Sequence, residues 1–281
     1  MNVSIIIPAY NEEDVITRCL EAIVPQVEKG DEIIIIDNNS IDKTLEIAKR
    51  YPVKIISETE QGLIPSRNTG FAAAKNEILA RIDADAAPNP DWLATLKTIF
   101  EDRSVAAATG PVSYYDMPIS KHNVKIDNAF RQGVKRVAKD FKFLYGTNMV
   151  LRAEAWEVIK DKTCSNESEI HEDIDIALHL DDEYYLIHYE PKLVVASSAR
   201  RIGDPLKDFY QYMKRYTNTY KQHGRDPMVA RIPMALYLST YPVTRFLYDF
   251  YDSEKERFSF IKLINSNESL KSLKGLFKSS P

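Results

Sequence analysis

Mostly apolar runs alternate with helical patterns through the N-terminal part of the chain. The runs at residues 3–8, 32–37, 53–57, 78–83 and 106–110 predict strands, and those at 3–8, 32–37 and 78–83 are typical of buried strands, covered on both faces. Between and after them, apolar residues recur at helical spacing over 15–24, 42–50, 65–74 and 92–100. This alternation predicts an α/β fold with a Rossmann-like, mostly parallel central sheet and helices on both of its faces.

The pattern changes after residue 110. Strand-like stretches at 145–152, 184–189 and 193–197 accompany helical patterns at 153–159 and 171–180, and an aromatic-rich helical segment begins at 205. We expect one domain over 1–204, made of the halves 1–110 and 111–204. A helical C-terminal extension should follow over 205–281.

The composition is that of a folded protein in a reducing compartment. Of the 281 residues, 44% are hydrophobic and 28% are charged, which argues against extensive disorder. The net charge of −4 gives no reason to expect nucleic-acid binding, and two cysteines do not make a disulfide framework. The start, MNVSIIIPAYNEE, does not read as a signal peptide, and the longest uncharged stretch, 232–244, is too short to span a bilayer. We therefore expect a cytoplasmic protein.

Polar residues gather directly after three of the predicted strands. They form the clusters Pro8-Ala9-Tyr10-Asn11, Asp37-Asn38-Asn39-Ser40 and Asp83-Ala84-Asp85. The carboxyl ends of parallel strands meet at one edge of a sheet, where open α/β folds bind their ligands. The three clusters therefore predict a single ligand site.

Asp83 and Asp85 end the predicted strand at 78–83, one residue apart, and two prolines follow them. An Asp-x-Asp tripeptide by itself also fits a solvated turn. At the ligand edge of a sheet, a hard divalent cation that bridges to phosphate oxygens would neutralise both carboxylates. This position favours a site for Mg²⁺ or Mn²⁺.

Two further residues belong to the same predicted edge. Asp37 comes too early in DNNSIDKT to cap the next helix, and it could accept hydrogen bonds from a nucleobase or a ribose. Arg67, in GLIPSRNTG, is either an ordinary surface arginine or a guanidinium placed at a helix start to bind a diphosphate.

Glu172 and Asp173 follow a polar loop and open the sequence EDIDIALHL. Acidic residues in a first helical turn suit the helix dipole without any further function. Beside a metal-bound phosphate ester, such a carboxylate would also be a credible general base for a hydroxyl nucleophile. The histidines at 171, 179 and 188 match no zinc-binding spacing, so we expect no structural zinc site.

Motifs of several other enzyme classes are missing from the sequence. No Gly-x-Gly-x-x-Gly follows the first strand, and there is no Gly-Lys-Ser/Thr phosphate loop and no Gly-x-Ser-x-Gly elbow. A dinucleotide-dependent dehydrogenase, a P-loop nucleotidase and an α/β-hydrolase are therefore disfavoured.

Six motifs occur in the order seen in family 2 glycosyltransferases with the GT-A fold. They are IIIPAYNEE, DNNSIDKT, GLIPSRNTG, IDADAAPNPDWL, YGTNMVLR and HEDIDIALHL. Over about residues 1–200, the chain resembles these inverting, metal-dependent enzymes, which use nucleotide sugars. The resemblance implies that 1–110 binds the nucleotide and that 111–204 holds the acceptor and the catalytic groups.

The resemblance also implies roles for particular residues. The residues expected around the nucleotide sugar are Pro8, Ala9, Tyr10, Glu12, Asp37, Asn39, Arg67, Asp83 and Ala84. Asp85 would bind the metal, and Asp83 would contact the ribose or the metal. The loop next to the donor sugar and the acceptor would consist of Gly146, Thr147 and Asn148. Asp173 would be the catalytic base, with Glu172 beside it.

The implied reaction is transfer of a hexose from a UDP- or GDP-sugar to a glycan or lipid-linked acceptor in cell-surface glycan or glycolipid biosynthesis. Processive members carry Gln-x-x-Arg-Trp, whereas this chain has Gln211-Tyr-Met-Lys-Arg215-Tyr216, which favours addition of a single sugar. One alternative is a non-catalytic nucleotide-sugar-binding protein on the same fold. Another is a sugar nucleotidyltransferase, which would need a glycine-rich basic loop where this chain has PAYNEE.

Three segments outside these motifs bear on partners and location. A basic segment at 121–142, an aromatic stretch at 232–251 and the amphipathic tail SLKSLKGLFKSS could contact the inner face of a membrane. The competing interpretations are a solvated helix for the first and a core or homodimer-interface helix for the second. Arg200, Arg201 and Lys207 are candidates for a further phosphate contact.

Overall fold

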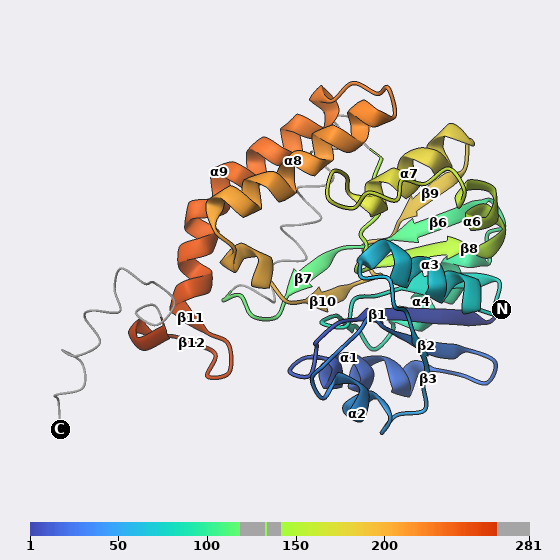
Figure 1. Cartoon of the computed structure of the whole chain (residues 1–281), viewed down its shortest axis with the longest axis horizontal. Helices are drawn as coiled ribbons and strands as arrows, with labels where there is room; N and C mark the ends of the chain where they lie inside the picture. Colours follow the sequence, from blue (N-terminus) through green and yellow to red (C-terminus); the bar gives the residue numbers. More distant parts are fainter. Residues whose placement is uncertain (119–132, 134–141, 263–281) are drawn as a thin grey trace.

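The computed structural model describes residues 1–118, 133 and 142–262 of the chain. A seven-stranded sheet in the order β3-β2-β1-β4-β8-β6-β9 forms its centre (Figure 1). The strands of this sheet are β1 Val3–Ala9, β2 Glu32–Asp37, β3 Lys54–Ser57, β4 Ile78–Arg81, β6 Val105–Thr109, β8 Met149–Arg152 and β9 Leu186–Tyr189. The described α-helices are α1 Ile16–Ile23, α2 Thr44–Ala48, α3 Leu63–Ala73, α4 Trp92–Phe100, α6 Ala153–Ile159, α7 Glu172–Asp182, α8 Leu206–Gln222 and α9 Met228–Phe250.

The sheet is mostly parallel, which confirms the prediction from sequence. β1 pairs in parallel with β2 and β4, β2 with β3, and β6 with β9, whereas β8 runs antiparallel between β4 and β6. From β1 the chain moves to β2 and β3 on one side and then returns to β4 on the other. The strand order therefore reverses between β1 and β4, and ligands of such sheets bind beyond the carboxyl ends of the strands at this point.

Both faces of the sheet are covered, which explains the unbroken apolar runs. Ile5 of β1 belongs to a buried cluster that contains Trp92 of α4 and residues of α1. Its neighbour Ile6 belongs to a second buried cluster, with Trp156 of α6 and residues of α3 and α7. Successive side chains of a strand point to opposite faces, so a strand with core on both sides needs apolar residues at every position.

A second, three-stranded sheet places further residues near the end of β4. Its strands are β5 Ala87–Pro88, β10 Val195–Ser197 and β7 Val112–Tyr114, in the order β5-β10-β7. The strand predicted at 193–197 thus forms β10, which pairs with these short strands and not with the main sheet. Since β5 closely follows β4 in the chain, this pairing brings the end of β10 and the 3-10 helix Arg200–Gly203 toward the ligand edge.

The helices α8 and α9 form a pair beside α7, to one side of the sheet (Figure 1). Ile174 of α7 shares a buried cluster with Tyr220 of α8 and Ala230 of α9. A hairpin of β11 Tyr251–Asp252 and β12 Arg257–Phe258 follows α9. Within the described part of the chain, no helix is long and apolar enough to cross a bilayer.

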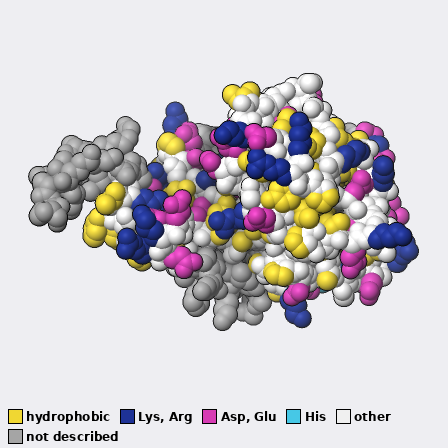
Figure 2. Space-filling model, turned by 90° about the horizontal axis from the view of Figure 1, so that it is seen from below, with side chains coloured by type: hydrophobic (Ala, Val, Ile, Leu, Met, Phe, Trp, Pro, Cys, Tyr) yellow, Lys and Arg dark blue, Asp and Glu magenta, His cyan; other side chains and the backbone are white. Residues whose placement is uncertain are grey.

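Two of the segments singled out in the sequence lie outside the described residues. They are the basic segment at 121–142, apart from residues 133 and 142, and the amphipathic tail at 269–280. On the face that Figure 2 presents, basic and acidic side chains of the described residues are intermingled.

Candidate active site

Three carboxylates meet at the carboxyl edge of the sheet, where Glu12 follows β1 and Asp83 and Asp85 follow β4. Arg200 links two of them. Its Nη1 and Nη2 donate hydrogen bonds to Glu12 at 2.8 and 2.6 Å, and its Nε lies 3.3 Å from Oδ2 of Asp85. The other oxygen of Asp85 accepts a hydrogen bond from the Ser197 hydroxyl at 3.2 Å. The segment after β10 therefore joins the loops that follow β1 and β4.

Asp85 is buried beside other negative charges. Burial, followed by repulsion from Asp83, raises the pKa of Asp85 to about 6, although the charge of Arg200 opposes this shift. Glu12 and Asp85 carry two negative charges against the single positive charge of Arg200, and every donor atom that Glu12, Asp83 and Asp85 offer is an oxygen. The residues present therefore fit a hard divalent cation such as Mg²⁺ or Mn²⁺.

A buried chain of ion pairs connects this edge to α7. Nη2 of Arg81 donates to Asp83 at 2.5 Å, and Nη1 of Arg81 pairs with Glu172, whose second oxygen pairs with Arg67. Burial alone would lower the pKa of Arg81, but Asp83 and Glu172 raise it above its ordinary value. Burial likewise favours the neutral acid of Glu172, but Arg81 and Arg67 hold its pKa below the ordinary value. Two guanidinium groups and two carboxylates thus balance each other.

Arg67 lies at a different position from the one expected near the donor. Its exposed fraction is 0%, and its guanidinium also donates to Asn68 at 3.1 and 2.9 Å and lies 5.2 Å from the ring centroid of Trp156. Arginine is rarely buried to this extent without a charged partner, and Glu172 provides one. The contacts of Arg67 make it a counter-ion of Glu172 and leave none of its surface available to a diphosphate.

Asp173 lies in the first turn of α7 and makes different contacts from its neighbour Glu172. Its Oδ2 accepts a hydrogen bond from the amide of Gly146 at 2.9 Å, and its Oδ1 accepts one from the amide of Ile174 at 2.8 Å. Burial, followed by the charge of Glu172, raises the pKa of Asp173 to about 7. Asp173 as a whole residue is half-buried. Such a group can accept a proton near neutral pH.

The loop before β8 carries the three residues expected beside the donor sugar. β8 runs antiparallel to β4, so this loop lies at the carboxyl end of β4. A Cβ at Gly146 would lie 2.7 Å from Nη1 of Arg81, so only glycine lets the loop approach this closely. The buried hydroxyl of Thr147 has no hydrogen-bond partner among the described residues, whereas the buried Asn148 accepts a hydrogen bond from Nε1 of Trp92 at 2.9 Å. Among the described residues, the hydroxyl of Thr147 is therefore left unpaired, and Asn148 holds the loop against α4.

The other predicted nucleotide-binding residues lie on or after the first strands. They are Pro8, Ala9, Tyr10, Asp37, Asn39 and Ala84. The ring of Tyr10 is exposed directly after β1. Asp37 is buried at the end of β2 and accepts a hydrogen bond from the amide of Ser40 at 3.2 Å. Asn39 has a positive φ of 67° and donates to the carbonyl of Thr59 at 3.0 Å. These residues surround the reversal point between β1 and β4.

Sequence reasoning missed Arg81, and it placed Asn38 in a polar cluster without giving it a role of its own. Arg81 is the only basic residue in the mostly apolar run at 78–83, and this anomaly is a signal that could have identified it. Asn38 is buried and fixes the loop before α3, because it donates to the carbonyls of Glu58 and Glu60 and accepts from the amide of Gly62. Three basic residues were proposed for a further phosphate contact, and of these Arg200 lies beside the carboxylates of Glu12 and Asp85.

Known proteins resemble this chain in sequence over its N-terminal half. The model of the family described as glycosyl transferase family 2 matches residues 4–159, which is more than half of the chain. Glycosyltransferase AglE of Haloferax volcanii is 37% identical over 99 residues, which make up 32% of this chain and 33% of that protein. The chain thus matches about a third of the length of this relative.

Solved structures share the fold at low sequence identity. The mannosyltransferase PcManGT of Pyrobaculum calidifontis, in complex with GDP-Man and Mn²⁺, has a TM-score of 0.62 and 20% identity, and the match covers 88% of this chain and 72% of that one. Glucosyl-3-phosphoglycerate synthase of Mycobacterium tuberculosis, in complex with Mn²⁺, UDP and glucosyl-3-phosphoglycerate, has a TM-score of 0.56 and 17% identity, and covers 80% of each chain. Because the family match covers more than half of the chain, from β1 through the aspartates after β4 to the end of α6, this chain belongs to glycosyl transferase family 2 and has the GT-A fold.

Proposed function

We propose that the protein is an inverting, metal-dependent glycosyltransferase that moves a single hexose from a nucleoside diphosphate sugar to an acceptor hydroxyl. One observation carries the proposal. A set of carboxylates suited to a divalent cation lies at the same sheet edge as Asp173, a separate carboxylate with a pKa of about 7. Inverting transfer needs both groups, because the leaving diphosphate requires positive charge and the incoming hydroxyl requires a base.

Asp173 would remove the proton from the acceptor hydroxyl as its oxygen attacks the anomeric carbon. The bond from that carbon to the diphosphate breaks on the opposite face, so the configuration at the carbon inverts. The amides of Gly146 and Ile174 hold the carboxylate in one orientation. Glu172, fixed by Arg67 and Arg81, adds the negative charge that keeps Asp173 basic near pH 7.

Asp85, together with Asp83, would hold the divalent cation, which would neutralise the leaving diphosphate when bound. Arg200 would add a second positive charge there, since 55% of its side chain is exposed while it contacts both Glu12 and Asp85. We assign the phosphate contact that Arg67 was expected to make to Arg200.

A UDP- or GDP-sugar is the proposed donor. The two structural neighbours are complexes, one with GDP-Man and Mn²⁺ and the other with UDP, Mn²⁺ and glucosyl-3-phosphoglycerate. In this chain, the exposed ring of Tyr10 and the polar groups of Asp37 and Asn39 would contact the base and the ribose. Thr147, with its unpaired hydroxyl, would contact the donor sugar or the acceptor.

A thermal-shift screen of UDP-, GDP-, dTDP- and CMP-sugars, with and without Mn²⁺, tests this proposal. Binding to the native state raises the apparent melting temperature, so the donor should raise it with Mn²⁺ and much less after EDTA treatment. The donor that gives a shift is then assayed for release of its nucleotide. Binding without any release, in water or with sugar and lipid acceptors, would favour a non-catalytic nucleotide-sugar-binding protein instead.

We also propose that α9 attaches the protein to the inner face of a membrane that presents a lipid-linked acceptor. Ile232, Leu236, Val243 and Phe246 are exposed and recur at helical spacing on one side of α9. The protein should co-sediment with anionic lipid vesicles, and the double variant Val243→Asp/Phe246→Asp should remain in the supernatant. A dimer that this variant dissociates, without vesicle binding by the wild type, would identify the face as a homodimer interface.

A further inference from the structure

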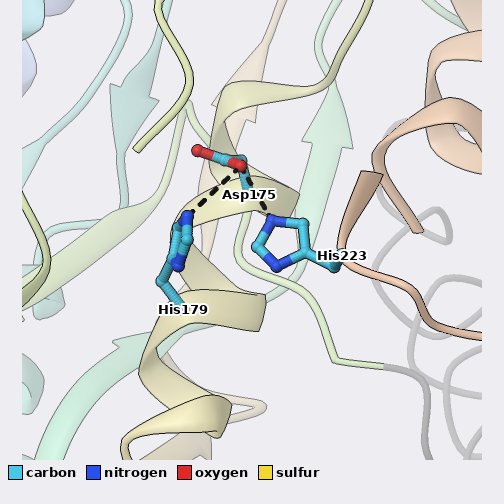
Figure 3. A group of neighbouring side chains, drawn as sticks. All are labelled: Asp175, His179 and His223. Carbon is cyan, nitrogen blue, oxygen red and sulfur yellow. Dashed lines mark hydrogen bonds and ion pairs between the residues drawn. The ribbon is translucent and has the colours of Figure 1, made fainter. Parts of the chain in front are cut away.

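A second group of ligand-type side chains lies between α7 and the end of α8 (Figure 3). Asp175 and His179 are one helical turn apart on α7, and His223 directly follows α8. Nε2 of His223 lies 2.9 Å from Oδ1 of Asp175, and Nε2 of His179 lies 3.7 Å from the same oxygen. The three ligand atoms all lie within 4.8 Å of one another. Three side chains from two helices therefore converge on one point.

The spacing of these atoms suits a tetrahedral metal ion. With bonds of about 2.0–2.1 Å, the donor atoms around tetrahedral zinc lie about 3.4 Å apart. The two measured separations, 2.9 and 3.7 Å, lie on either side of this value. At 3.7 Å, His179 is too far from Asp175 for a hydrogen bond, so hydrogen bonding alone does not explain why its Nε2 points at the carboxylate.

Each of the three side chains also faces a polar group outside the cluster. Oδ2 of Asp175 accepts a hydrogen bond from the amide of Cys164 at 2.9 Å, and the ring of His179 hydrogen-bonds the backbone of Lys162. Nδ1 of His223 lies 3.6 Å from Oδ2 of Asp182, just beyond hydrogen-bond distance. Histidine ligands of metals are commonly oriented in this way, through a carbonyl or a carboxylate on the second ring nitrogen. The outer contacts thus present Nε2 of both rings to the same oxygen.

A carboxylate buried as deeply as that of Asp175 needs a positively charged partner. Its side chain is 3% exposed, and those of His223 and His179 are 7% and 18% exposed. Among the described residues, Asp175 forms no ion pair with a lysine or an arginine. Arg225, which follows His223 closely in the chain, pairs instead with Asp181 and Asp182. A buried carboxylate beside two imidazoles is the environment of a metal ligand set.

We propose that Asp175, His179 and His223 bind a divalent transition metal ion of the zinc type, with water as the fourth ligand. Two imidazoles and one carboxylate suit Zn²⁺, whereas the all-oxygen set around Asp85 suits Mg²⁺ or Mn²⁺. The ion fastens the end of α8 to α7, the helix whose first turn carries Asp173. This site is structural and separate from the transfer reaction.

The sequence predicted no zinc site, because the spacing between the ligands follows no known zinc signature. Of the histidines considered there, only His179 takes part. His171 instead contacts the carbonyl of Tyr212 at 3.0 Å, and His188 lies 3.5 Å from Glu190. His223 joins the cluster only because α8 packs along α7.

Zinc binding to the full-length protein tests the proposal directly. The protein is stripped with a chelator, and excess Mg²⁺ is added to saturate the carboxylates around Asp85. Zn²⁺ affinity is then measured by competition with a chromophoric chelator, and the geometry by the visible absorption of bound Co²⁺. The variants are His179→Gln and His223→Gln at the ligands and Asp182→Asn beside them. The control is His188→Gln, which changes an exposed histidine outside the cluster.

Wild type and His188→Gln should each bind one Zn²⁺ and give the Co²⁺ spectrum of a four-coordinate site. Either ligand variant should bind Zn²⁺ at least about 100-fold more weakly, and Asp182→Asn about 10-fold more weakly. Zn²⁺ should also raise the melting temperature of the wild type but not that of His223→Gln. Wild type without tight Zn²⁺ binding, or equal affinity in His223→Gln, would overturn the proposal and leave a hydrogen-bonded cluster. Donor binding with Mn²⁺, measured in parallel, reports separately on the transfer site.

Discussion

At the scale of residues, Glu172 and Asp173 are adjacent carboxylates with opposite tendencies to ionise. Although burial opposes its charge, Glu172 is held ionised by Arg81 and Arg67. Burial and the charge of Glu172 raise the pKa of Asp173 to about 7, so this carboxyl group keeps its proton at lower pH. The pair therefore combines a fixed negative charge with a proton acceptor that titrates near neutral pH.

Transfer should lose rate as the pH falls below about 7, because the base must be ionised to accept a proton. The logarithm of kcat/KM should fall by about one for each pH unit on the acidic side. Donor binding with saturating Mn²⁺ over the same range separates this loss from protonation of Asp85, whose pKa is about 6. A profile of kcat/KM that stays flat through pH 7 would contradict the assignment of the base.

Removing the charge of Asp173 should stabilise the protein at alkaline pH. Its folded pKa of about 7 lies above the ordinary value, so the native state binds more protons than the unfolded state between these two values. The stability contribution of Asp173 therefore falls as the pH rises toward 7. Asp173→Asn should raise the free energy of unfolding by about 1–2 kcal/mol at pH ~8 and by almost nothing at pH ~4. Urea denaturation at both pH values measures this, and a gain that is equal at both would contradict the pKa shift.

At the scale of elements, a shared carboxylate attaches α7 to α3 and β4. Glu172 forms ion pairs with Arg67 of α3 and Arg81 of β4, two side chains with exposed fractions of 0% and 2%. Glu172→Gln would leave both guanidinium groups buried with less negative charge. It should lower the free energy of unfolding by about 3 kcal/mol or more.

The matched control for that prediction is Glu183→Gln, just after α7, where Glu183 pairs with Lys162 at the surface. Exposed ion pairs contribute little, so this variant should change the free energy by no more than about 1 kcal/mol. Denaturant titrations of both variants make the comparison. Equal effects would mean that the buried ion pairs do not hold α7.

Elements with strong periodic patterns could be predicted from the sequence, and short ones could not. β1 and β2 could be predicted because a strand with core on both faces needs apolar residues at successive positions. The strand β5 has two residues, Ala87 and Pro88, and no periodicity can identify so short an element. The helix expected over 42–50 forms only from Thr44 to Ala48, and Asp42 accepts a hydrogen bond from the amide of Thr44 just before it.

At the scale of the whole molecule, the C-terminal helices are part of the packing that positions the site. The amide of His171, directly before α7, donates to Oγ1 of Thr219 in α8 at 3.0 Å, and the hydroxyl of Tyr220 donates to the carbonyl of Lys142 at 3.0 Å. Unfolding of α8 would therefore remove support from the helix that carries Asp173. The division at residue 204 remains a proposal about organisation along the chain.

The described chain should consequently unfold in one cooperative step. A catalytic half and a helical extension that share the core around Ile174 and Tyr220 cannot melt separately without exposing it. Differential scanning calorimetry should give one transition whose calorimetric and van't Hoff enthalpies agree. Two resolved transitions would indicate an independently folding extension.

The candidate site residues that could be predicted from the sequence are those whose place follows from local position. Asp83, Asp85 and Asp173 stand at a strand end or a helix start, and such positions are visible in the chain itself. Arg200 reaches Glu12 and Asp85 only through the pairing of β10 with β5, so its role depends on tertiary structure. The burial of Arg67 could not be predicted for the same reason, because its partner Glu172 lies on a helix distant in sequence.

The variant Asp173→Asn, assayed for both donor binding and turnover, tests the central claim most directly. With the donor found in the thermal-shift screen and Mn²⁺, its donor dissociation constant should match that of the wild type. Its kcat should fall by about 100-fold or more, because the acceptor hydroxyl has lost its base. Asp181→Asn, on the outer end of α7, should retain both properties. Normal turnover by Asp173→Asn, or loss of donor binding in step with turnover, would contradict the account.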